Sequence, residues 1–362
     1  MAGVDDRLVD EIYEAALVPE RWPSVLDEVA RISESWAGGI IALDPDQRPR
    51  GIWTETYAPT YESFARGESS RYENVRAQRA LARRHQGFLR DIDLCSLEEL
   101  QVDPLYRHFL HPYGLGWTVG TFVNVPTMDL VIFDFARKAD DGPHNRSHVS
   151  VLDGYRPHLA RAAFLSARLG LERARSMTAA MDALGVPAAV FGGSGKIMAA
   201  NSDWEALWPR VERTFRKVEL DGLPNRIVGR SSAPAGRVRS IPIAGTASEA
   251  PLIIHVLPVC RSALDVFSGA SQIVVITPVR TPAAPPVEII SGLFDLSPAE
   301  ARIARALAEG RTIDGCATDF RVSTETVRKQ VRSIMSKTGT NRQVDLVRLL
   351  LGASPPPAAR NP

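Results

Sequence analysis

Apolar residues along the first 155 positions follow two different spacings. In residues 8–16 and 25–32 they recur every three to four positions, which is typical of amphipathic helices. In residues 39–43, 51–56, 117–125 and 130–137 they form short runs split by the turns DPDQRP and PTMD, which indicates two β-hairpins. A further helical stretch opens at Asp103-Pro104. Residues 1–155 are therefore predicted to form a mixed α/β domain.

The pattern turns helical again over residues 158–184, and Pro157 suits the first turn of such a helix. At 1.5 Å per residue the helix would be roughly 40 Å long. We expect residues 156–185 to connect two domains. The helix is either a dimer seam that transmits a signal or a packed connector, and the pattern favours neither.

Residues 186–280 are predicted to form a further unit. Two short apolar runs flank the turn GGSG, which is typical of a hairpin, and Asn201 is placed to cap a short helix that reaches Trp208. Two later apolar runs, at 251–259 and 271–279, are predicted to be strands. This segment is predicted to be a second mixed α/β domain.

Four helices are predicted in residues 291–352, between a proline-rich linker at 281–290 and a disordered tail at 353–362. A capping box, Ser297 with Glu300, opens the first helix and Gly310 ends it. The second begins at Thr312, the third runs from its N-cap Ser323 to Gly339, and Asn341 is expected to cap the fourth. The third helix buries Val327, Val331, Ile334 and Met335, and the fourth buries Val344, Leu346, Val347 and Leu350.

Charge separates this helical segment from the rest of the chain. The whole chain has a formal net charge of +1, but residues 296–352 hold ten Lys and Arg against six Asp and Glu, a balance of +4 that leaves −3 elsewhere. The third helix is expected to place base-reading side chains in the major groove of duplex DNA: Thr324, Glu325, Arg328, Lys329 and Arg332. Phosphate contacts are expected from Ser323, Thr326, Lys337 and Arg342. The alternative is a solvated basic helix face.

The segment LSPAEARIARALAEGRTIDGCATDFRVSTETVRKQVRSIMSKTGTNRQVDLVRLL resembles the C-terminal helix–turn–helix of LuxR-type transcription regulators. The matching positions are Leu296-Ser297-Pro298-Ala299-Glu300, Gly310, Ala317, Ser323-Thr324-Glu325-Thr326-Val327-Arg328, Lys337 and Gly339. The resemblance implies that Arg328, Lys329 and Arg332 read bases. Gln330 stands where histidine is usual, and Gly315 replaces a better helix former at a cost of up to about 1 kcal/mol.

The preceding domains have resemblances of their own. Residues 158–351 resemble regulators that join a PAS-like domain to this module, and residues 1–155 resemble a GAF-like sensor domain. The expected fold is therefore a multidomain α+β chain, with two mixed α/β sensor-like domains (GAF-like and PAS-like) and a C-terminal all-α four-helix helix–turn–helix domain.

Aromatic residues gather in the first domain and are candidates for a small-molecule pocket. They are Trp36, Trp53, Tyr57, Tyr61, Tyr72, Phe109, Tyr113 and Trp117. Trp53 and Tyr57 have a spacing similar to that in acyl-homoserine-lactone receptors of the same broad family, but the Asp-Pro expected after Tyr72 is replaced by Glu73-Asn74. Ordinary core packing is the alternative.

No cofactor or metal is expected. Three dispersed cysteines favour a reducing compartment, and His255 within an apolar run is interpreted as a core histidine. The pairs His108/His111 and His144/His148 have spacings that a metal could use, and Asp103 and Asp141 lie near them in the sequence. No cysteine or third histidine joins either pair, so they are interpreted as surface or turn histidines. No signal peptide or long apolar segment is visible, which predicts a cytoplasmic protein without membrane contact.

These features predict a signal-responsive transcription regulator rather than an enzyme. It would bind two DNA half-sites as a homodimer, respond to a small-molecule effector and contact RNA polymerase. The alternative is a small-molecule sensor whose helical C-terminal module docks a protein partner.

Overall fold

We analysed a computed structural model of the chain. It describes residues 4–43, 49–83, 85–127, 130–192, 195–217, 238–246, 249–259, 267, 270–279 and 283–353. The chain divides into two compact units, one of residues 1–179, 188–239 and 255–275, the other of 180–187, 240–254 and 276–362. The predicted tail at 354–362 and parts of the predicted turns at 44–48 and 193–194 lie outside the described residues.

The first sheet is antiparallel and has the strand order β2-β1-β5-β4-β3. Its strands are β1 (Ala37–Leu43), β2 (Pro49–Trp53), β3 (Leu89–Arg90), β4 (Leu115–Asn124) and β5 (Leu130–Lys138). β1 pairs with β2, and β4 pairs with β5, so both hairpins predicted in this domain are confirmed.

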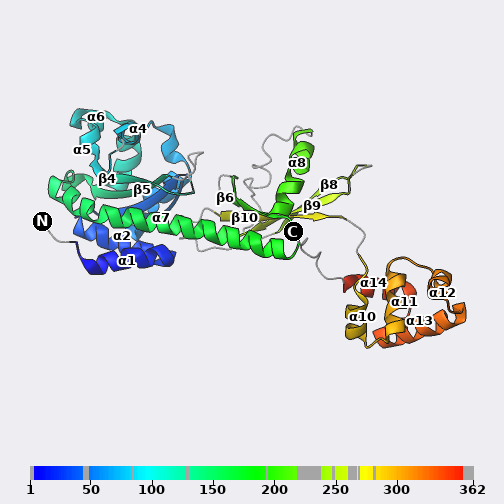
Figure 1. The fold of residues 1–362 in the computed structure, drawn as a ribbon. Helices are drawn as coiled ribbons and strands as arrows, with labels where there is room; N and C mark the ends of the chain where they lie inside the picture. The colour runs from blue at the N-terminus through cyan, green and yellow to red at the C-terminus, as the bar shows by residue number, and fades with distance from the viewer. Residues whose placement is uncertain are drawn as a thin grey trace. The chain divides into compact units, whose positions relative to one another are not determined.

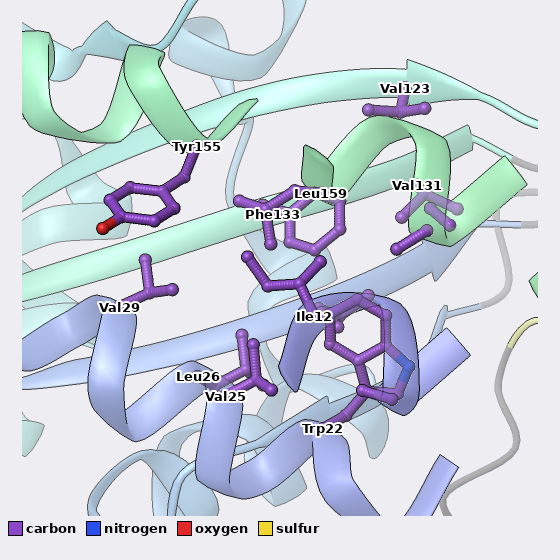
Figure 2. Packing of buried hydrophobic residues seen from close by; sticks show 14 of the residues in the cluster. Ile12, Trp22, Val25, Leu26, Val29, Val123, Val131, Phe133, Tyr155 and Leu159 are labelled. Atoms are coloured by element: carbon purple, nitrogen blue, oxygen red, sulfur yellow. The ribbon is translucent and has the colours of Figure 1, made fainter. Parts of the chain in front are cut away.

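Alternation along these strands separates two faces of the sheet. Val131 and Phe133 point to a core that is closed by helices α1 (Asp6–Leu17), α2 (Trp22–Ile32) and α7 (Arg146–Ala183), as Figures 1 and 2 show. Ile40 belongs to the same buried cluster. Trp22 and Phe133 are fully buried there, and burial of side chains of this size contributes about 2–3 kcal/mol each. Successive residues of a strand point to opposite faces of the sheet, so the strand residues next to those in this core face the other side. The same strands therefore also contribute to a second apolar cluster.

Short helices cover that second face (Figure 1). They are α3 (Ala58–Ala65), α4 (Val75–Arg83), α5 (Asp91–Leu94) and α6 (Leu97–Val102). Short 3-10 turns lie at Pro19–Arg21, Glu55–Tyr57, Glu68–Arg71, His111–Tyr113 and Ala139–Asp141, and one π-helical turn lies at Tyr106–Leu110.

Helix α7 corrects the prediction of a helix that begins at residue 158. It has 38 residues and begins at Arg146, so Pro157 lies in its interior rather than in its first turn. Among the described residues, no helix has both the length and the apolar character required to cross a bilayer.

The second sheet has the order β7-β6-β10-β9-β8. Its strands are β6 (Ala188–Gly192), β7 (Ile197–Ala200), β8 (Arg239–Ile243), β9 (Leu252–Pro258) and β10 (Ala270–Pro278). The predicted hairpin of β6 and β7 is confirmed, and Asn201 caps α8 (Ser202–Lys217) by accepting from the Trp204 N–H at 3.0 Å. The chain is thus mixed α+β with two antiparallel sheets.

The C-terminal module contains five helices among its described residues, one more than predicted. They are α10 (Val287–Phe294), α11 (Pro298–Ala308), α12 (Ile313–Phe320), α13 (Thr324–Thr338) and α14 (Gln343–Gly352). α10 begins inside the segment predicted as linker, because Pro286 precedes a helix whose Ile290 is fully buried in the module core. The N-cap of α14 is Arg342 rather than Asn341, and Val344 is 62% exposed rather than buried.

Candidate nucleic-acid interface and candidate ligand pocket

Helix α13 is held against the module by one apolar stripe. Val327, Val331 and Ile334 are buried against α11 and α12, as their spacing predicts. Ser323 caps the helix by accepting from the Thr326 N–H at 3.1 Å, and Gly339 ends it at φ 67°. α12 turns into α13 at Arg321, which adopts the left-handed conformation (φ 56°) that side-chain-bearing residues rarely occupy. This local geometry fixes which face of α13 is turned outward (Figure 1).

The outward face of α13 is basic and accessible. The Arg328 and Arg332 side chains are 57% and 67% exposed, and Lys329 is also exposed. Glu325 lies between the two arginines, 3.9 Å from Arg328 Nη1 and 3.4 Å from Arg332 Nη2. Exposed ion pairs of this kind contribute at most about 1 kcal/mol, so both guanidinium groups are readily released to another partner.

Three of the predicted DNA contacts also have roles within the protein. Thr324 is half-buried, and its hydroxyl donates to Asp314 Oδ1 at 3.3 Å, which links α13 to α12. The Ser323 and Thr326 hydroxyls lie 2.8 Å apart at the N-terminus of α13. These side chains are close to the basic face, and their predicted DNA contacts stay predictions.

Lys337 is placed differently from the other cations. Its ammonium donates to Glu300 Oε2 and to the Asp295 carbonyl, both at 2.9 Å, and Ser333 donates to Glu300 Oε1 at 2.6 Å. The donors Ser333 and Lys337 lower the pKa of Glu300 to about 2. In this structure Lys337 therefore joins α13 to the start of α11, whereas Arg342 is exposed beside α14.

A cavity of about 150 Å³ lies on the second face of the first sheet. Of the eight aromatic residues predicted to line a pocket, Tyr57, Tyr61 and Phe109 line it. The other five pack against the surrounding apolar cluster: Trp36, Trp53, Tyr72, Tyr113 and Trp117. Three of the eight residues therefore line a cavity and five pack around it, and the prediction that they bind a ligand stays a prediction.

Contacts of these five residues explain their positions outside the cavity. Trp53 stacks on Tyr61 with ring centroids 3.7 Å apart, and the Trp117 indole donates to the Ala139 carbonyl at 3.0 Å. Lys138 lies over the Trp36 ring at 5.4 Å. Tyr72 stacks on His108, and Tyr113 meets the edge of Phe109.

Two charged residues line the cavity that sequence reasoning did not select. Asp134 on β5 is 8% exposed and accepts from the Tyr57 hydroxyl at 2.6 Å. Burial raises the pKa of Asp134, although Arg76 and the Tyr57 hydrogen bond act in the opposite direction. A lone carboxylate in the apolar run LVIFDFA was the available signal for Asp134. No comparable signal marked Arg76, which belongs to a strongly polar helix, α4.

The histidines interpreted as surface residues divide into two groups. His108 and His111 are exposed as expected, but His144 and His148 are buried, which corrects that interpretation for the second pair. His144 Nε2 lies 2.9 Å from the Ser35 hydroxyl, and burial lowers the pKa of His144 to about 3. No group of three metal-ligating side chains is found among the described residues.

Comparisons with known proteins give limited information. No family model and no curated protein matches the chain. The crystal structure of Escherichia coli SdiA aligns with 93% of this chain and 90% of its own, at 12% identity and a TM-score of 0.30. SdiA in complex with octanoyl-rac-glycerol aligns with 96% of this chain and 88% of its own, at 13% identity and a TM-score of 0.28.

A third structure is the dimer of the LuxR-type receptor VqmA from Vibrio cholerae in the absence of target DNA. It aligns with 51% of this chain and 92% of its own, at 15% identity and a TM-score of 0.20. Scores this low identify neither a common fold nor a shared activity. A functional assignment therefore depends on the residues of this chain.

Proposed function

We propose that the chain is a LuxR-type, sequence-specific DNA-binding regulator that responds to a small molecule bound in its first domain. The observation that carries the proposal is the exposed Arg328, Lys329 and Arg332 face of α13, set on a helix whose opposite side is buried in a helix–turn–helix core. An α-helix with such a face fits the major groove, where arginine and lysine reach guanine O6 and N7.

The remaining assignments complete this proposal. Residues 1–155 serve as a GAF-like sensor domain and residues 186–280 as a PAS-like domain. Two copies of the chain bind two half-sites about one helical turn apart, in the cytoplasm, and effector binding alters their fit to DNA. RNA polymerase is the expected protein partner.

Selection from randomised duplex DNA with the full chain tests the proposal. A recurring sequence should emerge, and Arg328→Ala should weaken its binding by about 1–3 kcal/mol while relaxing preference at one base pair. Arg168→Ala removes an exposed cation from α7 and should leave affinity nearly unchanged. Absence of DNA binding at about 50 mM salt would favour the alternative, a sensor whose helical module docks a protein.

A further inference from the structure

The cavity of the first domain contains polar atoms that no described residue satisfies. Arg76 Nη1 is inaccessible to solvent and has no hydrogen-bond partner among the described residues, and neither has the hydroxyl of Tyr61, a residue that is 3% exposed. Arg76 as a whole is half-buried, so the observation concerns its guanidinium group. Buried donors without partners are costly, typically about 1–3 kcal/mol each, so they indicate a group that is supplied from outside the chain.

An acceptor, Asp134, lies close enough to Arg76 to interact with it electrostatically. Asp134 receives the Tyr57 hydroxyl on Oδ2, and no described residue donates to its Oδ1. Asp134 faces Gly120 across the β4–β5 pair, and a Cβ at Gly120 would come 3.4 Å from Asp134 Oδ1. The glycine therefore keeps open the space next to this oxygen.

Charge and size restrict the ligand. Arg76 interacts electrostatically with two buried carboxyl groups, Asp134 and Asp91, so an anionic ligand would add a further negative charge around one guanidinium. A cationic ligand would be repelled by Arg76. A cavity of about 150 Å³ is enough for a benzene-sized body, and Phe64, Phe109 and Phe122 provide an apolar lining for it.

We infer that the pocket binds a small uncharged aromatic molecule that presents a carbonyl oxygen to Arg76 and an O–H or N–H donor to Asp134. This inference rests on the proposed function, because it specifies the effector of the same sensor domain. Arg76 and Asp134 determine specificity, and the phenylalanines provide affinity that does not depend on the polar groups.

Calorimetric titration of the full chain, without DNA, tests the inference with five matched probes. 3-Hydroxyacetophenone has both polar groups, acetophenone only the acceptor, 3-methylphenol only the donor, 3-hydroxybenzoate a carboxylate, and ethylbenzene neither. We expect 3-hydroxyacetophenone to bind at least tenfold more tightly than each of the others. Equal or tighter binding of ethylbenzene or 3-hydroxybenzoate, or no binding of any probe, would overturn the inference.

Variants test which residues recognise the polar groups of the ligand. Arg76→Met should reduce affinity for 3-hydroxyacetophenone at least tenfold, with little change for ethylbenzene. Arg76→Lys retains a donor and should restore part of the loss. Arg83→Met alters an exposed arginine of the same helix and should have no effect. Unchanged binding in a folded Arg76→Met variant, checked by circular dichroism, overturns the assignment.

Different results would reject the proposed DNA-binding function and the proposed ligand class. Binding of the hydroxyketone by a chain that selects no DNA sequence would support this inference and reject the proposed regulator. Selection of a DNA sequence by a chain that binds no probe would reject the inference alone.

Discussion

Two carboxylic acids in different parts of the molecule have the same exposed fraction, but their pKa values are shifted in opposite directions. Asp134 in the first domain and Glu300 in the helical module are each 8% exposed. Burial raises the pKa of Asp134, whereas the donors Ser333 and Lys337 lower the pKa of Glu300 to about 2. Burial alone therefore does not decide the ionisation of a carboxyl group in this protein.

Burial has the largest influence on the pKa of Asp134, whereas hydrogen bonds have the largest influence on the pKa of Glu300. Glu300 accepts from the Ser297 N–H, the Ser333 hydroxyl and the Lys337 ammonium. Asp134 accepts from the Tyr57 hydroxyl. A carboxylate with three donors stabilises the fold, while one with a single donor retains capacity for a ligand. The same comparison distinguishes Glu300 of the helical module, whose hydrogen bonds are made within the protein, from Asp134 in the cavity of the first domain.

Replacement of Glu300 should have the largest effect on stability. Glu300→Ala removes the acceptor of three hydrogen bonds and leaves Lys337 without its ion-pair partner, so we expect a loss of about 3 kcal/mol in the module. Hydrogen exchange of the backbone amides of α11 and α13 in the full chain measures it. Glu309→Ala removes an exposed partner of Arg305 and should cost below about 0.5 kcal/mol. Equal losses in the two variants would contradict the role given to Glu300.

The pH dependence of the module should follow the same carboxylate. The pKa of Glu300 is lowered from 4.5 to about 2, so its stabilisation is present above pH 4.5 and is lost as the pH falls toward 2. Between pH 6 and pH 3 the loss should be about 2 kcal/mol. Exchange rates of α11 and α13 in the wild type and in Glu300→Gln, compared at each pH, isolate this contribution. A constant difference between the two proteins across this range would show that Glu300 is not the group responsible.

Parts of this structure that depend on local chemistry were predictable from the sequence. The capping box Ser297–Glu300 and the spacing of Val327, Val331 and Ile334 fixed α11 and α13, because caps and apolar periodicity act within a few residues. The hairpins of the first domain followed from their alternation in the same way.

The prolines were misleading at two positions because tertiary packing overrides local preference. Pro157 suggested a helix start, yet α7 continues through it with Leu152 and Leu159 fully buried on either side. Pro286 suggested a linker, yet the helix that follows it buries Ile290. A proline without its N–H is tolerated when such burial offsets the missing hydrogen bond.

The pocket could be predicted only in part. Three of the eight aromatic residues line the cavity. Arg76 is one of several arginines in the sequence of α4, and only the folded chain brings it close to Asp134. The interaction between Arg76 and Asp134 joins positions almost sixty residues apart, and no spacing rule applies over that distance. Residues that line the cavity are therefore harder to predict here than residues that shape a helix.

Replacement of Asp134 should affect stability less than replacement of Glu300, although both carboxyl groups are buried. Because burial raises the pKa of Asp134, its contribution to stability is full below pH 3.8 and is lost as the pH rises through the folded-state pKa. Asp134→Asn should therefore leave the stability of the first domain at pH 7 within about 1 kcal/mol of the wild type, or raise it. It should also weaken binding of 3-hydroxyacetophenone.

Asp91→Asn provides the matched control. Asp91 is 1% exposed and accepts from the Thr118 N–H, the Ile92 N–H and the Tyr106 hydroxyl. Asparagine replaces one carboxylate oxygen by an NH₂ group, so one of these donors would face another donor. We expect a loss of about 1–3 kcal/mol, measured by hydrogen exchange of β4 in the full chain. If Asp134→Asn destabilised the domain as much as Asp91→Asn, Asp134 would be a structural group like Glu300. The distinction between a satisfied module and a pocket prepared for a ligand would then be lost.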